Sequence, residues 1–474
     1  MLIGKLLRPC DKPQHEKKMK KKLQFAIAVM LLFSACSKEE LTPPSMQPQS
    51  TFDVRCSEEE PEYDSHISLD EARQDLETLL ADFASLSKSG NGGFSSRKIA
   101  DGFTLKSTRP SLSKSIGVAD TAKIHVFNFE DNGGFAIMSA TREMPSLLAI
   151  TDGGNIDTNE VIDDPGLIMF LSNLEGKPLN PSYTMDPELK NVGTDSNGNK
   201  VIVDEDIKYT DYDNTIYNPI GGFCRVHWGQ RSPYNKFCPI IDGDTSLTGC
   251  VATACAQLMS IYKYPNSYGG YYFHWNDMIS GKNTDDIARL MQQIGLAQNV
   301  DMDYGVNRSG ADPANIPRTL VNFGYSCGGT LKNYDKNEVV DEIKNGYSVL
   351  LGGFTHKYTK KILGIKVGTS YDGGHRWLAH GVLTRTRGIT YKKVVRHLGT
   401  GGKVLQEFKS EGSRAEKDDY ILCNFGWGDY YYNGYYLGDV FDAVEGPKFG
   451  ESFSKSNRDN YYQYKLTAVI GIRK

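Results

Sequence analysis

Cys250 has a reactive side chain at a position in the chain that would activate it. Residues 248–265 read T-G-C-V-A-T-A-C-A-Q-L-M-S-I-Y-K-Y-P, and their apolar members recur at the spacing of a buried helix that ends before Pro265. Free backbone N–H groups and the positive dipole end at a helix start stabilise a thiolate. The pattern therefore predicts a nucleophile at Cys250, directly after Gly249; a small buried core residue is the alternative. Cys255, about 140° further round the helix, belongs to the buried stripe.

A cysteine nucleophile needs a partner that carries a proton near neutral pH, and histidine is that side chain. His375 is the candidate among nine histidines, in the run D-G-G-H-R-W-L-A-H-G. Gly373 and Gly374 before it would let a substrate backbone approach closely. His380 is the rival, five residues further along the same expected strand and so on its opposite side. A structural role is the alternative for either histidine.

A third polar residue follows in the run I-L-C-N-F-G-W-G. Asn424 would accept the second ring N–H of the histidine and fix its tautomer and orientation. Trp427 would shield that hydrogen bond from water. These positions predict a cysteine–histidine pair with an orienting amide.

The composition is that of a globular protein large enough for two or three domains. The 474 residues are 39% hydrophobic and 24% charged, with a net charge of −4, which argues against nucleic acid as a partner. Frequent glycine (48) and tyrosine (27) favour a strand- and turn-rich fold. The nine cysteines form no C-x-x-C pairs and no histidine cluster has zinc-ligand spacing, so we expect neither a metal nor a cofactor.

The N-terminus has the pattern of an export signal. A basic run and a short apolar run precede S-A-C-S-K-E-E, and the apolar run is about half of the roughly 20 residues that span a bilayer. We interpret residues 1–36 as a signal peptide with a lipobox, with Met19 as an alternative start and Cys36 as the lipidated residue. Residues 37–65, polar and proline-rich, would form a tether.

Two folded regions follow, at 66–212 and 213–474. The first opens with a helical pattern in which Ser68 is an expected N-cap and Glu71 stands where a capping box places it. Three strand-like runs follow, I-H-V-F-N-F, F-A-I-M-S-A and L-L-A-I-T-D, and they carry no catalytic pattern. The second region contains Cys250, His375 and all four tryptophans.

The second region resembles streptopain and its relatives, secreted bacterial cysteine proteases with a papain-like fold. The resemblance implies an α+β fold in which the nucleophile helix packs on an antiparallel sheet. It also implies catalytic roles for Cys250, His375, Gln230 and Asn424, with Trp427, Gly249 and Gly374 in support. The similar blocks are W-G-Q-R-S-P-Y-N (228–235), T-G-C-V-A-T-A-C-A-Q-L-M, V-D-M-D-Y-G (300–305), G-G-H-R-W-L-A-H-G, N-F-G-W-G and T-A-V-I-G-I (467–472).

The first region resembles the propeptide of the same family, a smaller α+β domain that blocks the site until proteolysis removes it. The chain departs from the family at three positions near the site: Arg376 replaces a small residue, His380 an aspartate and Phe425 a tryptophan. Residues 354–372 and 386–417 look like insertions. We expect the first, which is basic and directly precedes His375, to form a hairpin at the rim of the site or an ornamental surface hairpin.

The resemblance implies peptide-bond hydrolysis through a thioester, with Gln230 and the Cys250 N–H holding the oxyanion. Expected partners are protein or peptide substrates, the chain's own prodomain, an unknown activating protease or self-cleavage, and a membrane through the lipid anchor, in the outer membrane or at the cell surface. The alternatives are a papain-fold acyl transferase and an inactive surface-exposed binding lipoprotein. Cys224 and Cys238 flank the Gln230 loop and form either a disulfide or two free thiols.

Overall fold

A computed structural model describes most of the two predicted folded regions. The described residues are 66–86, 97–106, 122–142, 144–176, 191–194, 200–210, 212–354, 361–363, 365–367, 374–399, 403–428, 432–441 and 466–474, all within the compact unit Asp64–Lys474. The predicted signal peptide with Cys36 and the tether lie outside them. Within these ranges, no helix is both long and apolar enough to cross a membrane.

The first region begins with the predicted helix, α2 (Leu69–Leu86), whose Glu71 N–H donates to Ser68 Oγ at 3.2 Å, as expected of an N-cap. The three predicted strands are confirmed as a meander, each antiparallel to the next. The elements of this region are β1 (Ile99–Lys106), β2 (Ala122–Phe129), η2 (Glu130–Asn132), β3 (Phe135–Ser139), β4 (Leu147–Thr151), β5 (Val161–Ile162), α3 (Pro165–Gly176), β6 (Asn191–Thr194) and β7 (Lys200–Tyr209).

The second region combines a helical part with long strands. Its helices are α4 (Cys250–Tyr262), α5 (Trp275–Ile279), α6 (Thr284–Gly295), η4 (Pro313–Asn315), α7 (Ile316–Asn322), α8 (Lys336–Lys344) and η6 (Gly438–Phe441). Its main strands are β8 (Asp213–Tyr217), β13 (Cys327–Asn333), β14 (Val349–Phe354), β17 (Gly374–Leu398), β18 (Val404–Asn424), β19 (Gly434–Leu437) and β20 (Thr467–Arg473). Short strands are β9 (Ile240–Ile241), β10 (Asp244–Thr245), β11 (Ser267–Tyr268), β12 (Tyr271–Tyr272), β15 (Lys361–Ile362) and β16 (Ile365–Val367).

One antiparallel sheet joins both regions, in the order β1-β2-β3-β4-β19-β18-β17-β14-β20-β13. The junction is β4 against β19, where Thr151 pairs with Gly434 and Ala149 with Tyr436. An added Cβ on Gly434 would collide with the backbone of Ile150, so a glycine is needed where these strands meet. The strands of the first region therefore extend the sheet that carries His375.

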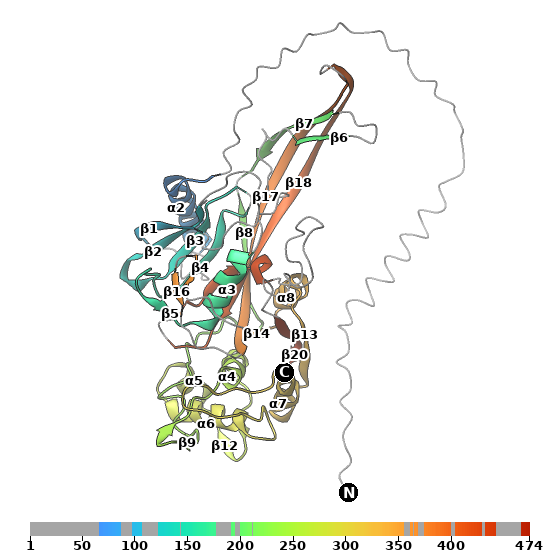
Figure 1. Ribbon diagram of the computed structural model, residues 1–474. Helices are drawn as coiled ribbons and strands as arrows, with labels where there is room; N and C mark the ends of the chain where they lie inside the picture. Colours follow the sequence, from blue (N-terminus) through green and yellow to red (C-terminus); the bar gives the residue numbers. More distant parts are fainter. Residues whose placement is uncertain are drawn as a thin grey trace, which may run out of the picture. The chain divides into compact units, whose positions relative to one another are not determined.

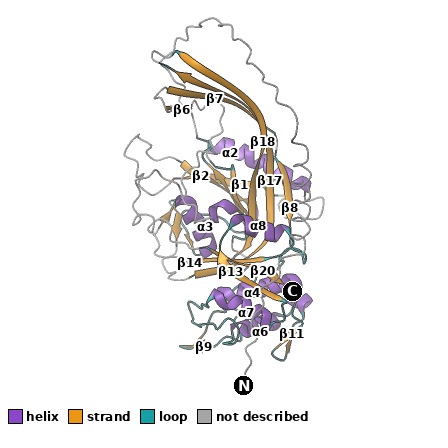
Figure 2. Cartoon of the chain, turned by 90° about the vertical axis from the view of Figure 1, so that its right-hand side faces the viewer, coloured by secondary structure: helices purple, strands orange, loops and turns teal. Residues whose placement is uncertain are grey.

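Two hydrophobic cores lie in the described unit. One gathers α2, α3 and the strands β2 to β4 with Trp377, Tyr420 and Tyr436 of the second region. The other surrounds α4 with residues of α6, α7 and β20. Figure 2 shows these helices grouped near β13 and β20. Because α4 is buried along almost its whole length, its first residue is held firmly in place.

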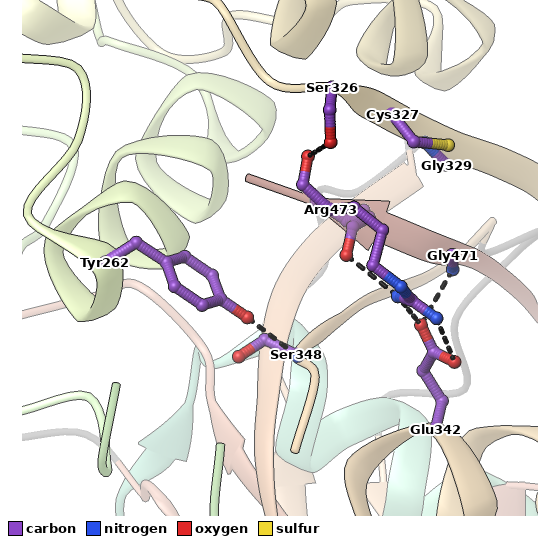
Figure 3. Close-up of polar contacts among 9 residues, drawn as sticks. Tyr262, Ser326, Cys327, Gly329, Glu342, Ser348, Gly471 and Arg473 are labelled. Atoms are coloured by element: carbon purple, nitrogen blue, oxygen red, sulfur yellow. Dashed lines mark hydrogen bonds and ion pairs between the residues drawn. The ribbon is translucent and has the colours of Figure 1, made fainter. Parts of the chain in front are cut away.

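The C-terminal strand is tied to α8 by an ion pair. Arg473 lies against Glu342, whose carboxylate also accepts the Gly471 N–H at 3.0 Å, and Ser326 Oγ donates to the Arg473 carbonyl at 3.2 Å (Figure 3). On the α4 side, the Ser348 N–H donates to Tyr262 Oη at 3.3 Å. These contacts tie β20 to α8 and to Ser326, and tie the last residue of α4 to the residue before β14.

The two predicted insertions adopt different structures. The described part of 386–417, residues 386–399 and 403–417, forms the outer part of the paired strands β17 and β18, with β7 paired along β17 (Figure 1). The described part of 354–372 is the hairpin β15–β16, and β16 pairs in parallel with β5 of the first region. Leu363 and Ile365 of this hairpin are fully buried in the core with Ile162. In this structure the β15–β16 hairpin therefore packs against the first region.

Candidate active site

Cys250 begins α4, as its apolar spacing predicts, and its side chain is 9% exposed. Its Sγ lies 4.0 Å from the carbonyl oxygen of Gly374, the residue before His375. Burial raises the pKa of the Cys250 thiol, and the Arg376 backbone N–H, the Arg376 charge and the N–H groups of the first helical turn oppose that rise. In this state Cys250 is a protonated thiol at neutral pH.

Gly249 makes the sharp entry into the helix. Its φ of 83° lies in the left-handed region, and an added Cβ would come within 2.6 Å of Met302 Sδ. Thr248 Oγ1 bonds Thr253 Oγ1 at 3.0 Å and the Thr253 N–H bonds the Gly249 carbonyl at 3.1 Å, which ties the loop to the first turn. The chain direction at Cys250 therefore depends on a glycine at 249.

His375 is 5% exposed on β17, and its ring is close to two tryptophans. Ring centroids are 5.9 Å from Trp377 and 6.0 Å from Trp427, both stacked. Nε2 bonds the Phe425 carbonyl at 2.9 Å. Burial lowers the pKa of His375 to about 4, since the Phe425 carbonyl offsets only part of the desolvation and the Arg376 charge adds to it. His375 is therefore neutral at pH 7 and, among the described contacts, is not hydrogen-bonded to Cys250.

Asn424 does not bond His375 in this structure, contrary to the sequence prediction. Its Oδ1 accepts from Gln257 Nε2 at 2.9 Å, and its Nδ2 donates to the Val226 carbonyl at 2.8 Å. The carbonyl of the next residue, Phe425, takes the histidine instead. The physical reason is that both ends of the Asn424 amide are already satisfied by α4 and the segment before Trp228.

Gln230 is buried, at 5% exposed. Its backbone carbonyl accepts the Thr248 N–H at 3.1 Å. Its side-chain amide has no hydrogen-bond partner among the described residues. The neighbouring Gly229 packs against Trp427 and Gly428. The backbone of Gly229 and Gln230 therefore lies between Thr248, which precedes α4, and the Trp427 segment.

His380, the rival histidine, has a different environment. A register shift in the β17–β18 pairing falls between Ala379 and Val382, so the strand is not unbroken there. The His380 ring accepts the Cys224 N–H at 3.1 Å and contacts the edge of Phe223. Burial lowers its pKa to about 3. The structure therefore gives His380 a structural role beside Cys224.

Cys224 and Cys238 are free thiols, which decides between the two alternatives left open by the sequence. Cys224 Sγ lies 3.6 Å from the Val226 carbonyl and 3.8 Å from Asn424 Nδ2. Burial raises the pKa of each thiol to about 11. Neither is ionised at neutral pH, and neither stands at the start of a helix as Cys250 does.

The first region contacts the wall of this site through α3. Gly166, in the first turn of α3, packs directly on the Phe425 ring, with no room for a Cβ. Met169 of the same helix reaches Gly353, the residue paired with His375. Helix α3 of the first region therefore packs against Phe425, whose carbonyl bonds the His375 ring, and against β14, the strand that pairs with His375.

Sequence reasoning missed two residues at this site. The Phe425 carbonyl holds His375, but a backbone acceptor leaves no signature in residue type. The sequence marks Arg376 only as a departure from the family and does not indicate its burial close to Cys250. No cluster of histidine, cysteine, aspartate or glutamate able to hold a metal occurs within the described residues.

Two family models match the chain. Residues 228–436 match the Peptidase C10 family, and residues 88–177 match the Spi protease inhibitor. Streptopain of Streptococcus pyogenes is 26% identical over 258 residues, which cover 44% of this chain. The match spans 58% of the length of that curated relative. The thiol protease/hemagglutinin PrtT of Porphyromonas gingivalis is 41% identical over 54 residues, 11% of this chain and 6% of that protein.

Similar solved structures come from Prevotella intermedia. A prointerpain A fragment covers 80% of this chain and 99% of its own, at 19% identity and a TM-score of 0.45. The active wild-type interpain A cysteine protease covers 55% of this chain and 96% of its own, at 21% identity and a TM-score of 0.34.

Proposed function

The chain belongs to the Peptidase C10 family, the streptopain family, and from this premise we propose that it is a cysteine endopeptidase made as a zymogen. The observation that supports this most is the position of Cys250 at the start of a buried helix, against the backbone on either side of His375. A sulfur held there is next in space to the backbone that carries the proposed base, and the ring of that base must leave the Phe425 carbonyl to act on it.

In the proposed reaction, the Cys250 thiolate attacks the scissile carbonyl while His375 is protonated. The Cys250 N–H and the Gln230 amide bind the oxyanion, and each such donor typically contributes about 3 kcal/mol to the transition state. His375 then protonates the leaving amine, and water hydrolyses the thioester with His375 as the base. Asn424 acts by fixing the segment that bears Phe425 and Trp427 rather than by bonding the histidine in the zymogen.

The state described here fits an inhibited form. His375 is neutral and bonded to the Phe425 carbonyl, and Cys250 is a buried thiol. The α3 helix lies on Phe425, and β4 continues the protease sheet through β19. We infer that residues 66–212 are an inhibitory prodomain, that its removal frees Phe425 and His375, and that residues 213–474 form the protease domain.

Export and anchoring are part of the same proposal. The predicted signal at residues 1–36 and the predicted lipidation of Cys36 would place the protein on the bacterial envelope, at the outer membrane or cell surface. Cys36→Ala is expected to abolish incorporation of radiolabelled palmitate and to release the protein from membranes. Palmitate still incorporated in the Cys36→Ala variant would refute the lipid anchor.

The activity is tested with variants of two cysteines on one helix. Cys250→Ala is expected to abolish hydrolysis of a fluorogenic peptide after proteolytic processing, because it removes the sulfur that the proposed reaction uses as its nucleophile. Cys255→Ala, five residues further along α4, is the control and is expected to keep the activity. Hydrolysis that persists in Cys250→Ala would overturn the assignment.

A further inference from the structure

Arg376 is a buried cation on β17, next to His375 in the chain. Its side chain is 4% exposed and packs over Gly352 of β14. Adjacent strand residues point to opposite faces, so its guanidinium lies on the face away from the His375 ring. Nη1 donates to the Leu350 carbonyl at 3.2 Å, and Nη2 donates to Thr467 Oγ1 at 3.0 Å.

All of these acceptors are neutral, and no carboxylate pairs with Arg376 among the described residues. Buried charges in proteins are normally paired, because removing an ion from water without a counter-ion is costly. Burial lowers the pKa of Arg376 to about 10, so it stays charged at neutral pH. The ionisable groups that favour this charge are the thiols of Cys250 and Cys255.

Of these two thiols, Cys250 is the one in a position that favours ionisation. Cys255 is fully buried among apolar side chains, and burial raises its pKa to about 12. Cys250 stands at the helix start, with its sulfur near the Gly374 carbonyl and the backbone N–H of Arg376 itself. The free N–H groups of a helix start favour a thiolate. Of the two cysteines, Cys250 has such groups around it and Cys255 does not.

We propose that Arg376 is a positioning residue whose fixed positive charge serves as a counter-ion for the Cys250 thiolate. The inference rests on the proposed role of Cys250 as the nucleophile. Two cations then act on the sulfur in the processed protein: His375, once its ring leaves Phe425, and Arg376, which needs no rearrangement. In the full chain described here, His375 is neutral, so Arg376 is the one full charge acting on Cys250 among the described residues.

The full chain therefore offers a direct test, a pH titration of the Cys250 thiolate by its ultraviolet absorbance. The signal is the difference between the chain and its Cys250→Ser variant, which subtracts the other cysteines. Arg376→Gln is expected to move the midpoint upward by about one pH unit, the size of effect that a nearby charge has on a partly buried group. Arg376→Lys keeps the charge and is expected to stay within a few tenths of a unit.

Arg385 provides the matched control on the same strand. It is 5% exposed and donates to Asn214 Oδ1 at 3.2 Å, and its guanidinium lies 4.0 Å from the centre of the Tyr212 ring. Arg385→Gln removes a buried arginine from β17 without altering the charge near Cys250, so the midpoint should not move. Thr467→Val, which removes one acceptor of the guanidinium, gives a milder change that tests the same point if Arg376→Gln does not fold.

We expect the titration midpoint to move upward in Arg376→Gln and by a smaller amount in Thr467→Val. It should not move in Arg376→Lys or in Arg385→Gln. An unchanged midpoint in Arg376→Gln, or in Thr467→Val where the former does not fold, would overturn the proposal and leave Arg376 a packing residue. Because the titration needs no substrate, a chain that fails to hydrolyse peptides but gives these shifts would contradict the proposed function alone.

Discussion

Gly249 sets the direction of the chain at Cys250, and its conformation leads to a prediction about stability. Gly249→Ala places a Cβ against Met302 Sδ at a φ of 83°, whereas Gly243→Ala, at a φ of 90°, meets no atom within 4 Å. Both variants incur the left-handed strain of about 1–2 kcal/mol. Gly249→Ala should lose a further 1–3 kcal/mol, roughly, from overpacking. Urea unfolding measures the difference, and equal losses in the two variants would contradict the close packing.

At the residue scale, the sequence predicts the position of Cys250 well because several local signals agree there. Apolar spacing, a preceding glycine and a proline after the last turn all mark the same helix, which runs from Cys250 to Tyr262. The partner of His375 could not be predicted in the same way. Whether the ring bonds Asn424 or the Phe425 carbonyl depends on which acceptors α4 has already engaged, and that is a tertiary property.

At the element scale, the short strand β5 holds the β15–β16 hairpin. Ile162 is 2% exposed and shares a core with Ile365, whereas its neighbour Val161 is 53% exposed. Ile162→Asp is expected to loosen this docking, because an unpaired carboxylate would be buried, and to let the full chain hydrolyse peptides sooner after synthesis. Val161→Asp is the control and should keep the delay of the unaltered chain. Equal delays in all three chains, timed with a fluorogenic peptide, would show that β5 does not restrain activity.

The predicted elements of both regions agree with the structure more fully than their connections do. Strand-like runs such as F-A-I-M-S-A become β3 because a short apolar run bounded by turn residues is a local signal of a buried strand. The β4–β19 junction and the parallel β5–β16 pair join segments hundreds of residues apart, and an edge strand carries no mark of its partner. The sequence indicates that residues 386–417 are an insertion, but it does not indicate that β17 pairs there with β7.

At the scale of the whole molecule, Asp164 makes the free energy of unfolding depend on pH. It is buried at the start of α3, its Oδ1 accepts the Leu167 N–H at 2.9 Å, and its Oδ2 has no partner among the described residues. Burial raises the pKa of Asp164 to about 7, against roughly 3.9 in an unfolded chain. The folded state therefore binds the proton more tightly, so the stability from this group is complete below about pH 4 and is lost as pH rises to about 7.

Asp164→Asn keeps an uncharged acceptor at this position and should flatten that dependence. We expect the free energy of unfolding of the full chain, taken relative to that of Asp164→Asn, to fall by a few kcal/mol between about pH 4 and 7. The comparison cancels the groups that both chains share, including His375 and His380, whose lowered pKa values act in the opposite direction. Asp163→Asn alters the exposed neighbour and should leave the slope as it is. Urea unfolding across this pH range tests the prediction, and identical slopes for the chain and Asp164→Asn would contradict it.

The central claim, a Cys250 nucleophile with His375 as its base under the control of a prodomain, is tested most directly by covalent labelling. An epoxide inhibitor of papain-like proteases is added to the full chain and to the processed chain, and mass spectrometry locates the label. The account predicts label on Cys250 in the processed chain, its loss in His375→Ala, and little label in the full chain, where His375 is bonded to Phe425. Folded, reduced and processed protein that carries no label on Cys250 would contradict the claim and favour a binding protein built on a protease scaffold.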